Sequence, residues 1–151
     1  MQSIVDDAFA VTRYHQENGH KTGHAILIIV DDVADRPDML HAAGRSILNS
    51  LAIRGRHANI SSWVAPQRPT LLSTVLRTQA TSLLVFRQRS VRDLLSFLDE
   101  YSAHVDKKAL EAMYNYATSK PDGFMMVGLM RPVGEMFHAN LDKRMIPQAA
   151  E

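Results

Sequence analysis

The stretch that decides the fold reads Ala25-Ile26-Leu27-Ile28-Ile29-Val30-Asp31-Asp32. An unbroken run of branched apolar residues leads directly into two adjacent carboxylates. A run this short and this apolar predicts a strand that is buried on both faces of a mostly parallel sheet. In such sheets ligands bind beyond the carboxyl ends of the strands, so Asp31 and Asp32 are expected where chemistry usually takes place.

The two acids allow two interpretations. A hydrophobic strand that ends in Asp and a second acid is the Walker B pattern of nucleoside triphosphatases. There the first acid holds hydrated Mg²⁺ and the second orients the attacking water. Alternatively, Asp31 and Asp32 only begin a turn and cap the next helix. The downstream sequence favours the first interpretation.

Length and composition restrict the class of protein. The 151 residues suggest one domain, and the 46% hydrophobic content is enough for an ordinary core. No apolar run approaches the roughly 18 to 20 residues that span a bilayer. The first residues lack the basic start and long apolar run of a signal peptide. The absence of cysteine excludes disulfides and thiolate metal sites, which fits an intracellular protein. Without a membrane-length apolar run, no membrane contact is expected.

The charge is distributed unevenly along the chain. Between Arg36 and Arg92 the sequence has nine arginines, no lysine and a single acid, Asp38. The arginine guanidinium is a planar fork that grips phosphate oxygens, whereas the lysine ammonium is a point charge. This arginine-rich middle third therefore favours contact with the phosphates of a nucleotide or a nucleic acid over an incidental surface bias.

Apolar spacing predicts helices over residues 2–17 and about 40–51. Arg54-Gly55-Arg56-His57 ends the second helix, with Gly55 as its C-terminal cap. Basic residues at a helix C-terminus suit the helix dipole. Arg54 and Arg56 therefore either terminate the helix or take part in function.

A glutamine follows the next predicted strand, residues 58–65. Pro66 and Pro69 hold Gln67 in an extended loop, because neither a strand nor a helix continues through them. A glutamine beside the acid-bearing strand is placed to hydrogen-bond a γ-phosphate or the attacking water. A glutamine in a turn is, however, usually only solvated.

Further strands are predicted at residues 81–86 and 124–129, with residues 135–139 as a hairpin partner. Ser90 and Asp93 form a capping box before one helix, and Asp106 caps another. The alternation of strands and helices through residue 101 indicates a parallel α/β sheet. No stretch matches GxxxxGK[ST], the loop that cradles nucleotide phosphates, and Lys21-Thr22 lacks the preceding glycines.

Several segments together resemble a known superfamily. Val64-Ala65-Pro66-Gln67-Arg68-Pro69-Thr70 looks like the A-T-Q-R-P-S element of FtsK/HerA-type DNA translocases. Asp31-Asp32 combined with Arg54-Gly55-Arg56-His57-Ala58-Asn59-Ile60-Ser61 resembles the poxvirus-type genome-packaging ATPases of large DNA viruses. The turn Asp122-Gly123-Phe124 before an apolar strand fits as well. The resemblance covers roughly residues 25–139.

The resemblance implies a partial P-loop NTPase domain of the ASCE type, a three-layer α/β sandwich with a mostly parallel sheet that lacks the first P-loop strand. Residues 1–24 would form a helix and lead-in, 25–101 the core from Walker B to sensor, and 102–151 a C-terminal helix and hairpin. Asp31 would bind Mg²⁺ through water, Asp32 would activate the hydrolytic water, and Gln67 would sense the γ-phosphate of ATP.

The same resemblance implies a homo-oligomeric ring motor that hydrolyses ATP and drives double-stranded DNA into a capsid at its portal or vertex. Arg56, with Arg54 and Arg77 as competitors, would act as an arginine finger on a neighbouring subunit's nucleotide. Such a finger is worth ~10³ to 10⁵ in rate. The location implied is a viral factory or the host cytoplasm or nucleus, with association with the virion as an option.

Two departures from the family pattern separate the hypotheses. Ala65-Pro66 replaces the threonine expected before the glutamine, and the P-loop with its strand is missing. The chain is then a truncation, one product of a split gene, or a degenerate relative, and alone it is expected to be inactive. Another FtsK/HerA-type translocase and a non-catalytic DNA- or phosphate-binding relative are the alternatives.

Two other site types are disfavoured by the sequence. His15, His20 and His24 would suit zinc on a helix, but Asn18-Gly19 and Gly23 argue against a helix there. A metal nuclease needs acids from further strands, and the arginine-rich middle third supplies none on a predicted strand.

Overall fold

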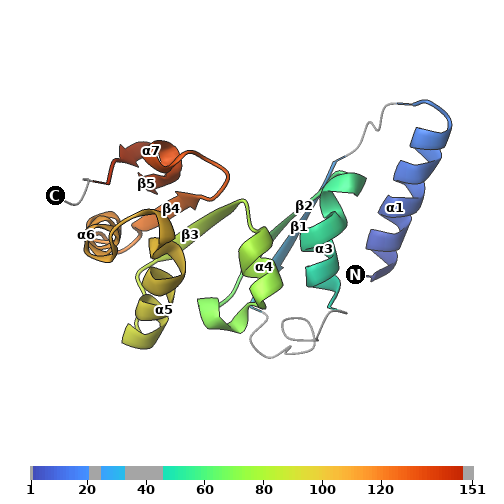
Figure 1. Ribbon diagram of the computed structural model, residues 1–151. Helices are drawn as coiled ribbons and strands as arrows, with labels where there is room; N and C mark the ends of the chain where they lie inside the picture. Colours follow the sequence, from blue (N-terminus) through green and yellow to red (C-terminus); the bar gives the residue numbers. More distant parts are fainter. Residues whose placement is uncertain (1, 21–24, 33–45, 148–151) are drawn as a thin grey trace. The chain divides into compact units, whose positions relative to one another are not determined.

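The protein has an α/β fold in the computed structural model, which describes residues 2–20, 25–32 and 46–147 (Figure 1). The chain divides into two compact units, unit 1 over Met1–Gln79 and unit 2 over Ala80–Glu151. The described residues form a two-stranded sheet in unit 1 and a four-stranded sheet in unit 2. None of the helices in these ranges has the length and apolar character needed to cross a bilayer.

Unit 1 is a short parallel sheet with helices packed on it. Its elements are α1 (Gln2–Glu17), β1 (Ile26–Asp31), α3 (Ile47–Arg54), η1 (Gly55–Ala58), β2 (Ile60–Ala65), η2 (Pro69–Leu71) and α4 (Thr74–Gln79). The helix predicted over residues 2–17 is confirmed by α1. The predicted start of the second helix, near residue 40, lies outside the described residues.

The two strands of unit 1 run parallel in a continuous register, from Ile26 opposite Ile60 to Asp31 opposite Ala65. One face of this sheet packs on the core, which contains Val30 of β1 and Ile60 of β2. On the opposite face Leu27 and Ile29 are 51% and 64% exposed. The prediction that this run is buried on both faces is therefore wrong for the described structure, in which helices cover one face.

The core of unit 1 joins α1 and α3 to the sheet. It contains Val5 and Ala8 of α1 and Leu48 and Leu51 of α3, all nearly inaccessible to solvent. Gly55 ends α3 in a right-handed conformation, with φ −53°, so it does not serve as a left-handed cap. A Cβ there would lie 3.1 Å from the Ile60 carbonyl oxygen, so the close approach of β2 explains the glycine.

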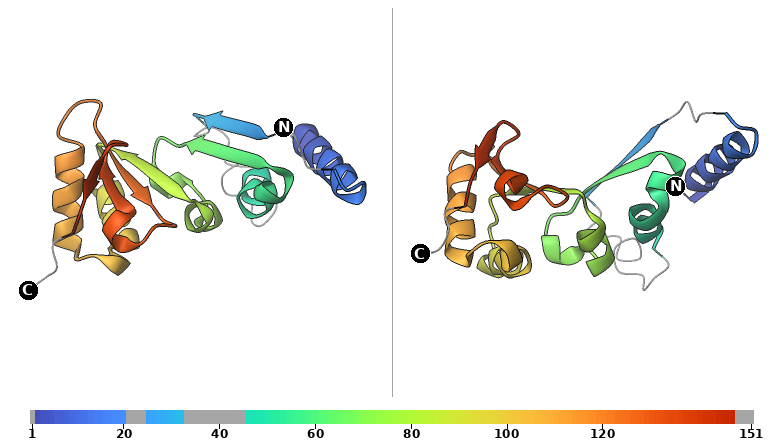
Figure 2. Two further views of the ribbon diagram at one scale, coloured as in Figure 1. Left: turned by 90° about the horizontal axis from the view of Figure 1, so that it is seen from above. Right: turned by 45° about the horizontal axis from the view of Figure 1, so that its top comes forward.

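Unit 2 is an antiparallel sheet covered by two main helices. Its elements are β3 (Ser82–Phe86), α5 (Val91–Tyr101), η3 (Ser102–His104), α6 (Lys107–Ala117), β4 (Phe124–Gly128), α7 (Val133–Met136), β5 (Phe137–Ala139) and β6 (Lys143–Met145). The strand order is β3-β4-β5-β6 (Figure 2). The sheet core packs against α5 and α6 through Phe97, Leu98, Leu110 and Tyr114.

The strand pairing differs from the sequence-based prediction. Parallel pairing within the described ranges is limited to β1 and β2, and β3 pairs antiparallel with β4. The predicted α/β class is confirmed, whereas a single mostly parallel sheet is not shown. The predicted hairpin partner of β4 is present as β5, but residues 133–136 form α7. Strand β6 was missed by the sequence analysis.

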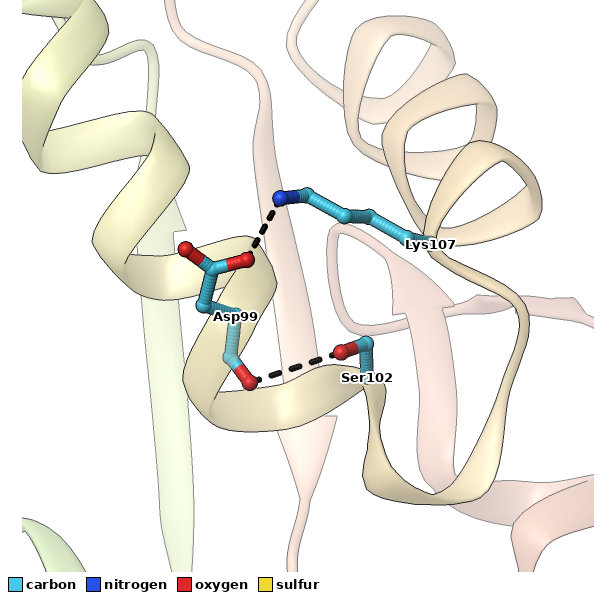
Figure 3. Close-up of polar contacts among 3 residues, drawn as sticks. All are labelled: Asp99, Ser102 and Lys107. Carbon is cyan, nitrogen blue, oxygen red and sulfur yellow. Dashed lines mark hydrogen bonds and ion pairs between the residues drawn. The ribbon is translucent and has the colours of Figure 1, made fainter.

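Polar contacts fix the helices of unit 2. The Ser90 hydroxyl accepts a hydrogen bond from the Asp93 N–H at 3.3 Å, which confirms this helix start. The Asp106 carboxylate accepts from the N–H groups of Lys108 and Ala109 at the start of α6. Lys107 pairs with Asp99 of α5 across the connection, with Nζ 2.5 Å from Oδ1, and this tethers the two helices (Figure 3).

Candidate functional site

The two sequence signals for chemistry in unit 1 meet at one edge of its sheet. Because β1 and β2 are parallel and in register, both strands end there, at Asp31 and Ala65. The Gln67 side chain donates from Nε2 to Oδ1 of Asp32 at 2.7 Å, although the two residues are 35 positions apart. The predicted proximity of Asp32 and Gln67 is confirmed, and their chemical roles remain predictions.

The backbone at Asp32 is left-handed, with φ 49°. Asp adopts this conformation more readily than most residues, and it ends the strand at the site. Asp31 precedes it in β1 and is exposed, on the same sheet face as Leu27 and Ile29. The edge thus presents two carboxylates and one amide to solvent.

These groups suit a magnesium ion only in combination with phosphates. Mg²⁺ prefers oxygen ligands and usually binds one or two carboxylates, several waters and substrate phosphate oxygens. The described residues contain no group of three or more His, Cys, Asp or Glu side chains arranged for a metal. Asp31 and Asp32 therefore fit the protein side of a Mg²⁺–nucleotide site and do not form a metal cage by themselves.

The candidates for the arginine finger lie elsewhere in unit 1. Arg54 and exposed Arg56 precede β2, at the end opposite Gln67. Arg54 donates to the Ser50 hydroxyl at 2.9 Å and lies 5.6 Å from the centre of the Phe9 ring. Six strand residues at ~3.3 Å each place the two ends about 20 Å apart. Arg56 is therefore not brought to the Asp32–Gln67 edge of its own chain.

Arg77 has a structural contact of its own. It is partly buried in α4 and donates from a guanidinium nitrogen to the Leu72 carbonyl at 2.7 Å. This bond ties the end of α4 back to the segment that enters it. The Arg77 guanidinium is thus engaged in holding the loop that follows Gln67.

A partly buried polar pair that the sequence analysis missed supports the same loop. The Ser73 hydroxyl donates to Oδ1 of Asn49 at 2.6 Å and accepts from the Leu76 N–H at 3.2 Å. Asn49 is only 4% exposed, on the buried side of α3. This pair fixes the start of α4 on α3, and therefore the far end of the segment carrying Gln67. An asparagine within an apolar helix stripe was the available signal.

The histidine hypothesis finds no support in the described part of the chain. The rings of His15 and His20 lie 6.0 Å apart in an edge-on arrangement. His24 and the Lys21-Thr22 pair lie outside the described residues. A zinc site therefore has no described ligand set.

Comparisons of the chain with protein-family models, curated proteins and solved structures find no match. The edge formed by Asp31, Asp32 and Gln67 and the order of the sequence motifs are therefore the observations that bear on function.

Proposed function

We propose that the chain is the C-terminal part of an ATPase that couples ATP hydrolysis to the packaging of double-stranded DNA into a viral capsid. The observation that carries this proposal is the hydrogen bond between Gln67 and Asp32 at the carboxyl edge of two parallel strands. Ligands bind at that edge in parallel α/β sheets. The motif order of the FtsK/HerA superfamily supplies the reaction class.

Each group at the edge has a role in this proposal. Asp31 holds Mg²⁺ through water, and Asp32 orients the water that attacks the γ-phosphorus of ATP. Gln67 binds a γ-phosphate oxygen when nucleotide is present. An amide that already reaches the Asp32 carboxylate lies close enough to the attacking water to report the state of the phosphate.

The phosphate-binding loop comes from polypeptide beyond these 151 residues. Its strand pairs with β2, whose second edge has no strand partner among the described residues. The same polypeptide covers Leu27, Ile29 and Trp63, which are half-exposed or more on the open sheet face. The result is the mostly parallel, three-layer P-loop sandwich that the resemblance implies.

The arginine finger acts between subunits of a ring. Arg56 lies about 20 Å along the strand from its own Gln67, so it reaches a nucleotide only on a neighbouring copy. Arg54 and Arg77 remain competitors, although each already has a contact within its own chain. Removal of the true finger is expected to lower hydrolysis by ~10³-fold or more.

The test first requires a GxxxxGK[ST] sequence in frame with, or next to, the coding sequence of this chain. The chain is then combined with the product of that sequence, and DNA-stimulated phosphate release is measured. We expect no hydrolysis by the chain alone, hydrolysis by the pair, and loss of hydrolysis with Asp31→Ala. The matched control is Asp142→Ala, an exposed acid in unit 2, which is expected to leave the rate unchanged. Mixing Arg56→Ala with Asp31→Ala subunits should restore part of the rate. An inactive pair, or an active Asp31→Ala, would contradict the proposal.

A second candidate is a non-catalytic DNA-binding relative. It is favoured by the exposed arginines of the middle third, among them Arg56, Arg68, Arg87 and Arg89, in a sequence that lacks the phosphate loop. Such a protein binds duplex DNA with a steep salt dependence, because each phosphate contact releases counterions. DNA affinity that is unchanged by ATP and by Asp31→Ala, together with an inactive pair, selects this candidate.

A further inference from the structure

Strand β3 is a terminal strand of the unit 2 sheet. The strand order is β3-β4-β5-β6, so within the described ranges neither β3 nor β6 has a strand on its outer side. Short strands, lysines and prolines protect such edges from pairing with another chain. Strand β6 has this protection, because it is three residues long and Lys143 and Arg144 are exposed. Strand β3, Ser82-Leu83-Leu84-Val85-Phe86, has neither charge nor proline and is the edge suited to pairing.

The backbone of β3 presents its outward groups in a symmetrical pattern. The Leu129 N–H donates to the Thr81 carbonyl at 3.0 Å, so Thr81 directs its backbone groups toward β4. In an antiparallel ladder, backbone groups alternate between the two sides of a strand from one residue to the next. Ser82, Leu84 and Phe86 therefore direct their N–H and carbonyl groups to the outer edge. Leu84 lies at the centre of this set.

We propose that β3 pairs antiparallel with β3 of a second copy of this chain, about a two-fold axis at Leu84. The Leu84 N–H donates to the Leu84 carbonyl of the second copy, and symmetry supplies the reverse bond. Ser82 lies opposite Phe86 of the second copy, and the N–H of that Phe86 donates to the Ser82 carbonyl. The contact closes after two copies, because an isologous interface uses the same surface on both.

The side chains fit this register on both faces of the sheet. On the core face, Leu83 packs against the core of unit 2 and Val85 is 7% exposed. Leu83 lies opposite Val85 of the second copy, so the two cores join across the axis. On the other face, Leu84 is 49% and Phe86 51% exposed. Leu84 meets Leu84 of the second copy, and the large Phe86 meets the small Ser82, so apolar surface is covered without crowding.

The charge that follows β3 does not oppose this pairing. In the same register Arg87 lies opposite Thr81 of the second copy, so the two copies of Arg87 do not face each other. Arg87 also donates to the Ser119 carbonyl of its own chain at 3.4 Å. The two four-stranded sheets thus become one continuous sheet. The inference is independent of the ATPase proposal, since it uses unit 2 alone and no nucleotide.

The test is sedimentation equilibrium of the whole chain up to roughly 100 μM, because a contact of this size is weak. We expect a reversible equilibrium between monomer and dimer. Leu84→Asp and Leu84→Lys each place two like charges opposite each other at the axis, and each should weaken association at least about tenfold. A mixture of the two variants should associate again, because opposite charges then face each other. This rescue requires Leu84 to lie at the axis.

Matched controls use Leu95, which is 45% exposed on α5. Leu95→Asp and Leu95→Lys are expected to associate as the unmodified chain does, and circular dichroism checks the folding of all variants. A covalent readout uses Leu84→Cys, since the chain has no cysteine. The Cα atoms of a hydrogen-bonded antiparallel pair are ~5.5 Å apart, which a disulfide spans. With oxidised glutathione, Leu84→Cys should form a covalent dimer and Leu95→Cys should not.

Three results would overturn the inference. The first is an unmodified chain that is monomeric at the highest concentration. The second is a dimer that Leu84→Asp leaves intact, or a mixture of Leu84→Asp and Leu84→Lys that stays monomeric, since either excludes an axis at Leu84. The third is a phosphate-loop polypeptide whose binding is abolished by Leu84→Asp while the chain alone does not associate, which would assign this edge to that polypeptide.

Discussion

In the described residues, each of the two sheets has one face with exposed apolar side chains, and the two sheets differ in how their strands pair. In unit 1 the open face belongs to a parallel pair, β1–β2, and presents Leu27, Ile29 and Trp63. In unit 2 it belongs to the antiparallel sheet β3–β6. Antiparallel sheets commonly have one solvated face, whereas parallel sheets are almost always covered on both. Among the described residues, unit 1 is therefore the unit that departs from the usual arrangement of its kind of sheet.

The hydrophobic cores of the two units differ in how far their side chains are shielded from solvent. In unit 2, Leu110, Met125, Val127 and Phe137 are completely inaccessible to solvent and belong to one cluster. In unit 1 only Ala58 reaches that level among the residues that the structure describes. Since stability follows the apolar area that is buried, unit 2 is expected to be the more stable of the two.

The largest expected effect is that of Phe137→Ala, which empties the centre of unit 2. It should lower the free energy of unfolding by about 3–5 kcal/mol, because a rigid surrounding keeps the cavity open. Urea titration followed by circular dichroism measures the loss. Leu141→Ala, at a side chain that is 69% exposed, is the control and should change it by less than about 0.5 kcal/mol.

A smaller effect is expected for Leu48→Ala, the matching change in the core of unit 1. Leu48 is 1% exposed, so its truncation leaves a cavity, but leucine is a smaller side chain than phenylalanine. We therefore expect a loss of about 2–3 kcal/mol. Hydrogen exchange of the β1 and β2 amides measures it. A loss of unfolding free energy larger than that of Phe137→Ala would contradict the expectation that unit 2 is the more stable unit.

Loss of a helix cap in unit 2 should be smaller still. Asp106→Ala removes the acceptor for two N–H groups at the start of α6 and should cost about 1 kcal/mol. Asp106→Asn, which keeps an acceptor, should restore most of it. Thermal unfolding of the three proteins measures the difference, and equal midpoints would show that this cap does not stabilise unit 2.

The smallest effect on stability is expected at Trp63, which is 63% exposed and the only tryptophan in the chain. Trp63→Ser should change the free energy of unfolding by less than about 0.5 kcal/mol. In the unmodified chain acrylamide should quench the fluorescence of Trp63 nearly as well as that of free indole. Addition of the phosphate-loop polypeptide should protect it. Protection in the chain alone would mean that the open face is already covered.

The edge that holds the candidate site could be predicted from the sequence, because it follows from one rule of sheet topology. Two consecutive strands joined by a helix run parallel, so the groups after each strand meet at one edge. The acids at 31–32 and the glutamine at 67 followed from that rule. The Asn49–Ser73 pair did not, because Asn49 in an apolar helix indicates only a buried polar group, and nothing in the sequence specifies Ser73 as its partner.

The antiparallel pairing of β3 with β4 could not be predicted from the sequence, for a related reason. The run Leu83-Leu84-Val85-Phe86 is apolar throughout, as a buried parallel strand is, but such a run does not specify which strand lies beside it or in which direction. Likewise a strand was predicted over residues 135–139, whereas residues 135 and 136 belong to the helical turn α7 after Pro132. A proline at a helix N-terminus loses no hydrogen bond.

The left-handed backbone at Asp32 limits which residues fit at this position. Asn adopts such angles about as easily as Asp, and its side-chain oxygen still accepts from Gln67. Glu is far less suited to this backbone, so lengthening the acid would disturb the main chain as well as the chemistry. The geometry thus provides a neutral isostere, Asp32→Asn, that separates the contribution of a single negative charge from that of shape.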